Sequence, residues 1–291
     1  MIPFAKGHGL GNDYLVFEED DLPGALSAEA IVKICDRNWG VGSDGILLRV
    51  ETGRADFGLR IFNPDGSEAE KSGNGLRIFA KYLRDHGHAK RDVFTVDTKG
   101  GIVECQCRVE NGRVTFVTVE MGHATFRPAA IPMTSAASEA VGVSLSLGAA
   151  GTVTATAVSV GNPHCIVFVD RLDDDEVRRL GPMLERHAAF PNRTNVQFAK
   201  VLGRDAIEIR IWERGAGYTL ASGSSSCGAA SAAVRNGHCD HGRISVRMPG
   251  GELVVHVRPD FTLTLEGPVE EVCTGTLAPE FEEAYVRGAG R

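Results

Sequence analysis

The chain has 291 residues, 43% of them hydrophobic, and a formal net charge of −7. This length predicts a sizeable core in one large or two medium domains, and we expect two. The acidic balance, without a dense Lys/Arg block, argues against a nucleic-acid partner. No apolar run approaches the ~18 residues of a membrane span, and no signal-peptide pattern opens the chain, so we expect a cytoplasmic protein without a membrane partner. The seven cysteines are expected to be reduced thiols rather than a disulfide framework.

The pattern along the chain is that of short β-rich runs separated by few helical segments, which predicts an α+β fold rich in strand. We expect surface helices with solvated charged faces at about 28–38 and 173–187, and two further helices at about 75–85 and 225–235. The clearest expected strands are residues 93–96, 114–117, 155–160, 165–169, 244–248 and 253–257.

The helices at 75–85 and 225–235 look like counterparts, although the internal repeat in the sequence is faint. The second is almost featureless and apolar, with Ala229, Ala230, Ala232 and Ala233, and such a helix is normally surrounded on several sides. We therefore expect two pseudo-symmetric domains, each a mixed β-sheet or barrel wrapped around a central α-helix. The N-terminal domain is expected to contain residues 1–120 plus 272–291, and the C-terminal domain residues 121–271.

Each central helix is preceded by a Ser-Gly pair, Ser72-Gly73 and Ser222-Gly223. A helix N-terminus leaves backbone N–H groups unpaired, which suits a carboxylate, and glycine allows a ligand to approach closely. The simpler interpretation is that both serines are only N-caps. The pattern alone leaves both interpretations open.

Several polar segments accompany the two serines. Asparagine beside Gly or Pro is usually a turn residue, and taken singly each one is best explained so. Glu213-Arg214 differs, because a charged pair at the end of an apolar strand must be solvated, paired or bound to a ligand such as an amino acid. His164 is either a proton carrier or a buried core histidine. The segments are residues 8–13, 62–67, 161–164, 194–196 and 212–215.

Metal and nucleotide sites are not expected. The clusters at 86–88 and 238–241 lack the spacing of a zinc site with a second ligand pair. The glycines at 7–11 follow no strand and have the wrong spacing for a dinucleotide loop.

In their order and separations, these segments resemble the diaminopimelate epimerase family over nearly the whole chain, most specifically at 63–74 and 213–227. The resemblance implies two pseudo-symmetric domains with a substrate cleft between them, and a cofactor-independent epimerase or racemase that removes and returns an α-proton, as from LL- to meso-diaminopimelate in the lysine and peptidoglycan precursor pathway. It implies a small amino-acid substrate, no cofactor and a homodimer. It also implies proton transfer at positions 72 and 222, supported by His164 and Glu213. Substrate would be bound by Asn12, Asn63, Asn162, Asn195, Glu213 and Arg214, and its α-carboxylate by Gly73, Asn74, Gly223 and Ser224.

The chain departs from the family pattern where the chemistry is done. Ser72 and Ser222 replace the two proton-transferring cysteines, and Cys227 matches a cysteine that is not the catalytic one. Gly45 stands where the family often has glutamine, and Tyr218 where it has glutamate. These two departures imply that the pocket for the distal end of the substrate differs from that of the family.

Serine is a far weaker proton acceptor than cysteine. If its hydroxyl pKa lies about five units above the ~8.5 of a thiol, forming the base costs on the order of 7 kcal/mol more, and a helix dipole supplies at most ~2 kcal/mol. An adjacent base must then take part, such as His164 or Glu213, or the substrate must have a more acidic carbon. An engineered replacement of the cysteines is a further explanation, but Lys71 and the serine run 224–226 also depart from the pattern and favour natural divergence. The alternatives are an isomerase or dehydratase on the same scaffold, or a catalytically silent amino-acid-binding homologue.

Overall fold

The computed structural model describes residues 1–287 and divides the chain into two compact units. Unit 1 contains Met1–Val119 and the segment from Gly267 onward, and unit 2 contains Glu120–Glu266. The chain passes from unit 1 to unit 2 within β8 (Arg113–His123) and returns within β17 (Thr262–Pro268).

Unit 1 is a mixed sheet with a central helix. Neighbouring strands run in the order β18, β1, β2, β3, β4, β6, β7, β8; the β2–β3 and β4–β6 pairs are parallel and the others antiparallel. The bounds are β1 Pro3–Gly9, β2 Asn12–Glu18, β3 Ile46–Val50, β4 Phe57–Phe62, β5 Glu68–Ala69, β6 Val93–Thr98, β7 Gly101–Glu110 and β18 Glu270–Thr276, with helices η1 Glu19–Asp21, α1 Ala28–Cys35, α2 Gly73–Asp85, α5 Pro279–Phe281 and the π-helical η4 Glu282–Val286.

Unit 2 repeats this arrangement. Its strands run in the order β9, β10, β11, β12, β13, β15, β16, β17, and again only two of these neighbouring pairs, β11–β12 and β13–β15, are parallel. The bounds are β9 Val143–Ser146, β10 Thr152–Ser159, β11 Pro163–Phe168, β12 Asn195–Gly203, β13 Ala206–Glu213, β14 Gly217–Thr219, β15 Gly242–Met248 and β16 Gly251–Val257, with helices η2 Pro128–Ala130, η3 Gly148–Ala150, α3 Asp174–Glu185 and α4 Gly223–Arg235.

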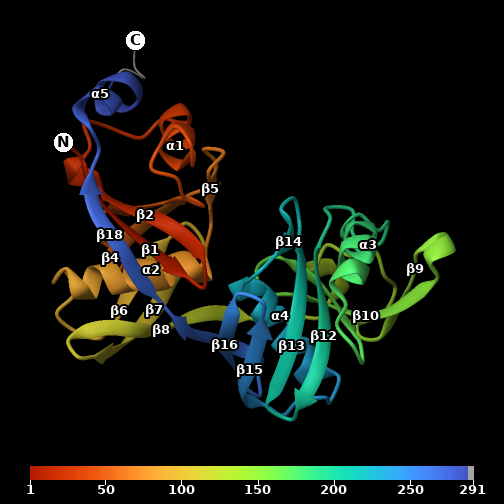
Figure 1. Cartoon of the computed structure of the whole chain (residues 1–291). Coiled ribbons are helices and arrows are strands. Elements are labelled where there is room, and N and C mark those ends of the chain that lie inside the picture. The colour runs from red at the N-terminus through yellow and green to blue at the C-terminus, as the bar shows by residue number, and fades with distance from the viewer. Residues whose placement is uncertain (288–291) are drawn as a thin grey trace. The chain divides into compact units, whose positions relative to one another are not determined.

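The central helices are α2 and α4, and each packs against strands of its own unit (Figure 1). α4 is buried from Ser225 to Val234, which explains why its residues are so small: Ala229, Ala230, Ala232 and Ala233 let the surrounding strands approach on every side. Both helices end before a glycine with positive φ, Gly87 and Gly237, a conformation that glycine adopts without strain. The predicted α+β architecture with strands around a central helix is confirmed.

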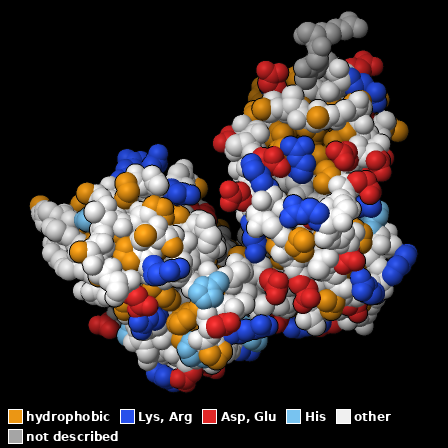
Figure 2. Space-filling model, turned by 180° about the vertical axis from the view of Figure 1, so that it is seen from behind, with side chains coloured by type: hydrophobic (Ala, Val, Ile, Leu, Met, Phe, Trp, Pro, Cys, Tyr) orange, Lys and Arg blue, Asp and Glu red, His pale blue; other side chains and the backbone are white. Residues whose placement is uncertain are grey.

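The predicted helices and strands are present, with small shifts at their ends. The segments expected as surface helices form α1 and α3, both shorter than predicted, because Asp36 and Arg186 leave the helical path. None of the helices in residues 1–287 has the length and apolar character needed to cross a bilayer. Figure 2 shows basic and acidic side chains interspersed over the visible face of each unit.

Candidate functional site

Ser72 lies immediately before α2 in an extended conformation, and its Oγ accepts a hydrogen bond from the Gly75 N–H at 3.0 Å. Serine is suited to this N-cap position because its oxygen satisfies an amide of the first turn. The two preceding amides, those of Gly73 and Asn74, have no acceptor within the helix. The α2 N-terminus therefore offers two N–H donors and a hydroxyl to a carboxylate.

Tyr14 contacts Ser72 directly. Its hydroxyl lies 3.3 Å from Ser72 Oγ, and its side chain reaches there from β2, where the residue is 7% exposed. Gly45 makes room for the ring, because a Cβ at this position would lie 2.7 Å from Tyr14 Cε1. Sequence reasoning noted the unusual Gly45 but missed Tyr14, whose proximity to Ser72 depends on strand register.

A chain of amide hydrogen bonds fixes the first turn of α2. Asn74 Nδ2 donates to Asn12 Oδ1 at 2.9 Å, and Asn12 Nδ2 donates to Asp44 Oδ2 at 2.8 Å. On its other side, Asn74 Oδ1 accepts from Arg77, whose side chain is fully buried. The structure thus brings Asn12, Asn74 and Ser72 together, and adds Asp44 and Arg77.

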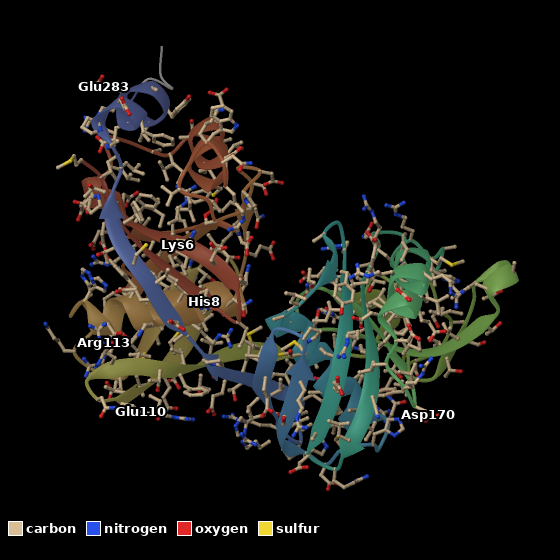
Figure 3. The ribbon with its side chains drawn as sticks, in the orientation of Figure 1. Lys6, His8, Glu110, Arg113, Asp170 and Glu283 are labelled. Atoms are coloured by element: carbon tan, nitrogen blue, oxygen red, sulfur yellow. The ribbon has the colours of Figure 1, made fainter. Side chains whose placement is uncertain are left out.

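Charges around Asp13 stabilise this corner of unit 1. Lys6 Nζ lies 3.0 Å from Asp13 Oδ2, and Arg37 Nη2 lies 2.7 Å from Asp13 Oδ1. Desolvation raises the pKa of Asp13, but the hydrogen bonds from Arg37 and Lys6 outweigh it and lower the pKa below its usual value. Figure 3 shows Lys6 and His8 on β1. Asp13 is therefore ionised and holds β1 and β2 to the loop before β3.

Asn63 has a local role in the structure. Its N–H donates to the Ser67 carbonyl, its carbonyl accepts from Gly66 N–H, and its Nδ2 donates to Ser67 Oγ at 3.0 Å. This is the turn interpretation that the sequence favoured for a single asparagine.

Ser222 caps α4 as Ser72 caps α2. Its Oγ accepts from the Ser225 N–H at 3.5 Å, and its carbonyl accepts from both the N–H and the Oγ–H of Ser226. Ser222 is 6% exposed, and Gly223 is the first helical residue. Cys227 is fully buried one turn further on.

His164 is fully buried on β11. Its Nε2 lies 2.9 Å from Asn162 Oδ1, and Asn162 Nδ2 donates to Ser224 Oγ at 3.5 Å. Burial lowers the pKa of His164 to about 3, although the Gln197 side chain partly opposes this shift. The imidazole is therefore neutral at physiological pH, and Nε2–H donates to Asn162. The structure brings His164, Asn162 and Ser224 together.

Gln197, which sequence reasoning missed, connects this group to the helix cap. Its Nε2 donates to Ser225 Oγ at 3.0 Å, and the amide N–H of the same serine donates to Ser222 Oγ. Gln197 is fully buried. No motif signalled it, since glutamine within an apolar strand has no fixed meaning.

Asn195 links three segments of unit 2. Its Nδ2 donates to the Pro163 carbonyl at 3.0 Å, and its Oδ1 accepts from the Arg214 N–H at 3.0 Å. The Arg214 side chain is exposed and donates to the Asn192 carbonyl, and Glu213 ends β13. Asn195 thereby fixes the backbone that carries Glu213 and Arg214.

A buried carboxylate supports the same turn. Glu185 is 3% exposed and accepts hydrogen bonds from Trp212 Nε1 at 2.9 Å and from the Gly215 N–H at 3.2 Å. Desolvation raises its pKa, but these bonds and Arg193 lower it below the usual value overall. Sequence reasoning treated this helix as a solvated face and missed Glu185. Among residues 1–287, no three His, Cys, Asp or Glu side chains converge in a way that could hold a metal ion.

The matching relatives cover nearly the whole chain. The family model described as diaminopimelate epimerase matches residues 4–127 and 156–272. A protein named diaminopimelate epimerase 2, from Nostoc sp. (strain PCC 7120), is 48% identical over 278 residues, which are 95% of this chain and 96% of that protein. A diaminopimelate epimerase from Pelotomaculum thermopropionicum is 43% identical, covering 94% and 97% of the two chains.

Solved structures agree on the fold. A probable proline racemase from Agrobacterium radiobacter K84 has a TM-score of 0.68 at 16% identity, covering 96% of this chain and 93% of that chain. A Bacillus anthracis phenazine biosynthesis protein of the PhzF family has a TM-score of 0.69 at 18% identity, covering 95% and 99%. The expected resemblance is confirmed, and the match to a family named for an epimerase supports the predicted function and the isomerase class. The chain belongs to the diaminopimelate epimerase family.

Proposed function

We propose that this protein is an amino-acid epimerase whose substrate is diaminopimelate and that Ser72 and Ser222 exchange protons with opposite faces of the α-carbon. One observation carries the proposal: in a chain of this family, both units have a serine as the N-cap of their central helix. The first amides after each serine have no acceptor within the helix. Inversion at carbon needs one group to remove a proton and another to return it on the opposite face.

The substrate contacts follow from the two helix N-termini. The amides at Gly73, Asn74, Gly223 and Ser224 bind the α-carboxylate, which stabilises the negative charge that develops when the α-proton leaves. Asn12, Asn63, Asn162, Asn195, Glu213 and Arg214 bind the polar ends of the substrate. Asn12 and Asn162 are held in place by Asp44 and by the His164 imidazole, respectively.

Glu213 and His164 support proton transfer in different ways. His164 is neutral and its Nε2–H is committed to Asn162, so it orients that amide rather than delivering a proton. Glu213, at the end of β13, is the acidic group of unit 2 that we assign to proton transfer.

The experiment is proton NMR of LL- and meso-diaminopimelate with the pure protein in D2O. We expect loss of the α-proton signal with inversion, and a fall of about 10²- to 10⁴-fold in Ser72→Ala and in Ser222→Ala. Deuterium incorporation without inversion would instead indicate one-sided proton removal, as in an isomerase or dehydratase. Binding of both isomers without exchange would assign the chain as an amino-acid-binding homologue, in which both serines are only caps.

The cellular setting follows from the same proposal. An enzyme acting on diaminopimelate belongs to lysine and peptidoglycan precursor synthesis in the cytoplasm, and it acts as a homodimer without a cofactor, nucleic acid or membrane partner. Light scattering of the purified protein checks the dimer, and a mass of one chain would contradict it.

A further inference from the structure

The Ser72 hydroxyl has a phenol as its neighbour. Tyr14 Oη lies 3.3 Å from Ser72 Oγ, and either atom can be the donor. Ser72 Oγ also accepts the Gly75 N–H, so its own proton is available to the phenol oxygen. The pair therefore forms a short path along which a proton can move from Ser72, at the α2 N-terminus, to Tyr14 on β2.

The surroundings hold Tyr14 in this position. The residue is 7% exposed, and its ring fills the space beside Gly45, where any Cβ would lie 2.7 Å from Cε1 and 2.4 Å from the Phe62 carbonyl oxygen. A side chain at position 45 would displace the ring. The contact is thus a consequence of the packing of β2 against the loop before β3.

The two units differ in the side chain that stands at this place. Tyr14 stands at the third position of Asn12-Asp13-Tyr14, and His164 at the third position of Asn162-Pro163-His164, on equivalent strands of the two units. Each lies beside the asparagine that contacts residue 74 or 224 of its own unit. Tyr14 occupies in unit 1 the place that His164 occupies in unit 2, but its hydroxyl contacts the cap serine, whereas the His164 Nε2–H is committed to Asn162.

We propose that Tyr14 is the proton relay of Ser72, an inference that rests on the proposed epimerase function. When Ser72 Oγ takes the proton from the substrate α-carbon, its own hydroxyl proton passes to the phenolate oxygen of Tyr14, and the electron pair of the C–H bond stays on the α-carbon. In the reverse direction, neutral Tyr14 gives its proton to Ser72 Oγ as Ser72 gives its proton to the carbanion. No free alkoxide forms in either direction.

The acidity of a phenol makes this route preferable to an isolated serine. The ordinary pKa of tyrosine is ~10, so phenolate is accessible at a much smaller cost than an aliphatic alkoxide. In other enzymes a hydroxyl becomes reactive when a second group that can accept its proton lies within hydrogen-bond reach. Ser72 and Tyr14 form such a pair in unit 1.

The test is a comparison of Tyr14→Phe with Tyr82→Phe in the D2O exchange assay. Tyr82 is a matched control, since it also belongs to unit 1 and donates a hydrogen bond, to Glu18 Oε1 at 2.7 Å, but does not contact Ser72. Proton loss is measured separately from the LL and meso isomers and as a function of pH. Circular dichroism melting shows that each variant folds.

We expect Tyr14→Phe to slow proton removal about 10²-fold from the same isomer that Ser72→Ala slows. We also expect the wild-type rate to rise at alkaline pH, and this rise to be lost in Tyr14→Phe. Tyr82→Phe should keep the wild-type rate and pH profile. Two results overturn the relay alone, provided that the wild type exchanges its substrate proton. In the first, Tyr14→Phe has the wild-type rate; in the second, Tyr14→Phe slows proton loss equally from both isomers. Absence of exchange in the wild type overturns the proposed function and the relay with it.

Discussion

The Ser72 and Ser222 sites share a backbone frame but differ in the side chains that surround it. Ser222 follows Ser72 by 150 residues, and the same interval separates Asn162 from Asn12 and His164 from Tyr14. Two backbone hydrogen bonds repeat at this interval. The bond from Leu76 N–H to the Ser72 carbonyl corresponds to that from Ser226 N–H to the Ser222 carbonyl. The bond from Gly100 N–H to the Glu70 carbonyl corresponds to that from Gly250 N–H to the Leu220 carbonyl. Because the two units share this backbone arrangement, each places a serine and two amides at the N-terminus of its central helix in the same way.

The contact between the helix cap and the sheet shows how the side chains diverge. In unit 1 the apolar Leu47 faces Gly75, where an added Cβ would lie 2.9 Å from Leu47 Cδ2. At the equivalent positions of unit 2, Gln197 donates a hydrogen bond to Ser225. One contact is close apolar packing and the other a buried polar pair, so the frame does not dictate the chemistry beside each serine.

Restoring a thiol at one site at a time should give the largest effect. In Ser72→Cys or Ser222→Cys the group at the helix N-terminus has an ordinary pKa of ~8.5, several units below that of a hydroxyl. We expect proton removal on the altered face to accelerate at least ~10²-fold in the D2O assay, while the other face is unchanged. Ser135→Cys, in an exposed segment of unit 2, is the control for an added thiol. If either cysteine is no faster than serine, the hydroxyl is not what limits that face.

The buried His164 should give unit 2 a pH dependence of stability. Its pKa is lowered to about 3 in the folded state, so the unfolded chain binds a proton that the folded chain does not. Stability is then fully present above the unfolded pKa of ~6.5 and falls as the pH decreases toward 3. At pH 5 the loss is about 2 kcal/mol, at 1.36 kcal/mol per unit.

Urea unfolding of the wild type and of His164→Gln at pH 7 and pH 5 measures this loss. The variant should be less stable at pH 7 but should show about 2 kcal/mol less dependence on pH in this range. Asp13 and Glu185 also have lowered pKa values, but they change the stability only at lower pH. Their contribution is the same in both proteins, so it does not affect the comparison. Equal pH dependence in both proteins would show that His164 takes up its proton in the folded state at the same pH as in the unfolded chain.

The sequence predicted the features that local chemistry determines. The two Ser-Gly pairs marked the starts of α2 and α4, and the small side chains of α4 predicted its burial. The contacts beside the serines could not be predicted in the same way. Tyr14 and Ser72 are 58 residues apart and meet only because of strand register, and Gln197 and Ser225 are 28 residues apart.

The internal repeat was faint for a related physical reason. The interval of 150 residues joins positions whose side chains are unlike, such as Tyr14 with His164 and Leu47 with Gln197. What the two units share is backbone hydrogen bonding and strand order, which many side chains satisfy. A comparison of the two units by residue type therefore shows little similarity, whereas a comparison of their strand pairings shows the repeat clearly.

The smallest expected difference lies in the two caps themselves. Ser72 Oγ accepts its amide hydrogen bond at 3.0 Å, whereas Ser222 Oγ lies 3.5 Å from the Ser225 nitrogen. Loss of a serine cap typically costs about 1 kcal/mol, and a longer hydrogen bond is worth less. Ser72→Ala should therefore lower the free energy of unfolding by about 1 kcal/mol and Ser222→Ala by less. Urea unfolding followed by circular dichroism measures both, with Ser72→Asp and Ser222→Asp as controls that keep an acceptor at the cap. An equal or larger loss in Ser222→Ala would mean that its cap is at least as strong as that of Ser72, and that the length of this hydrogen bond does not determine the strength of the cap.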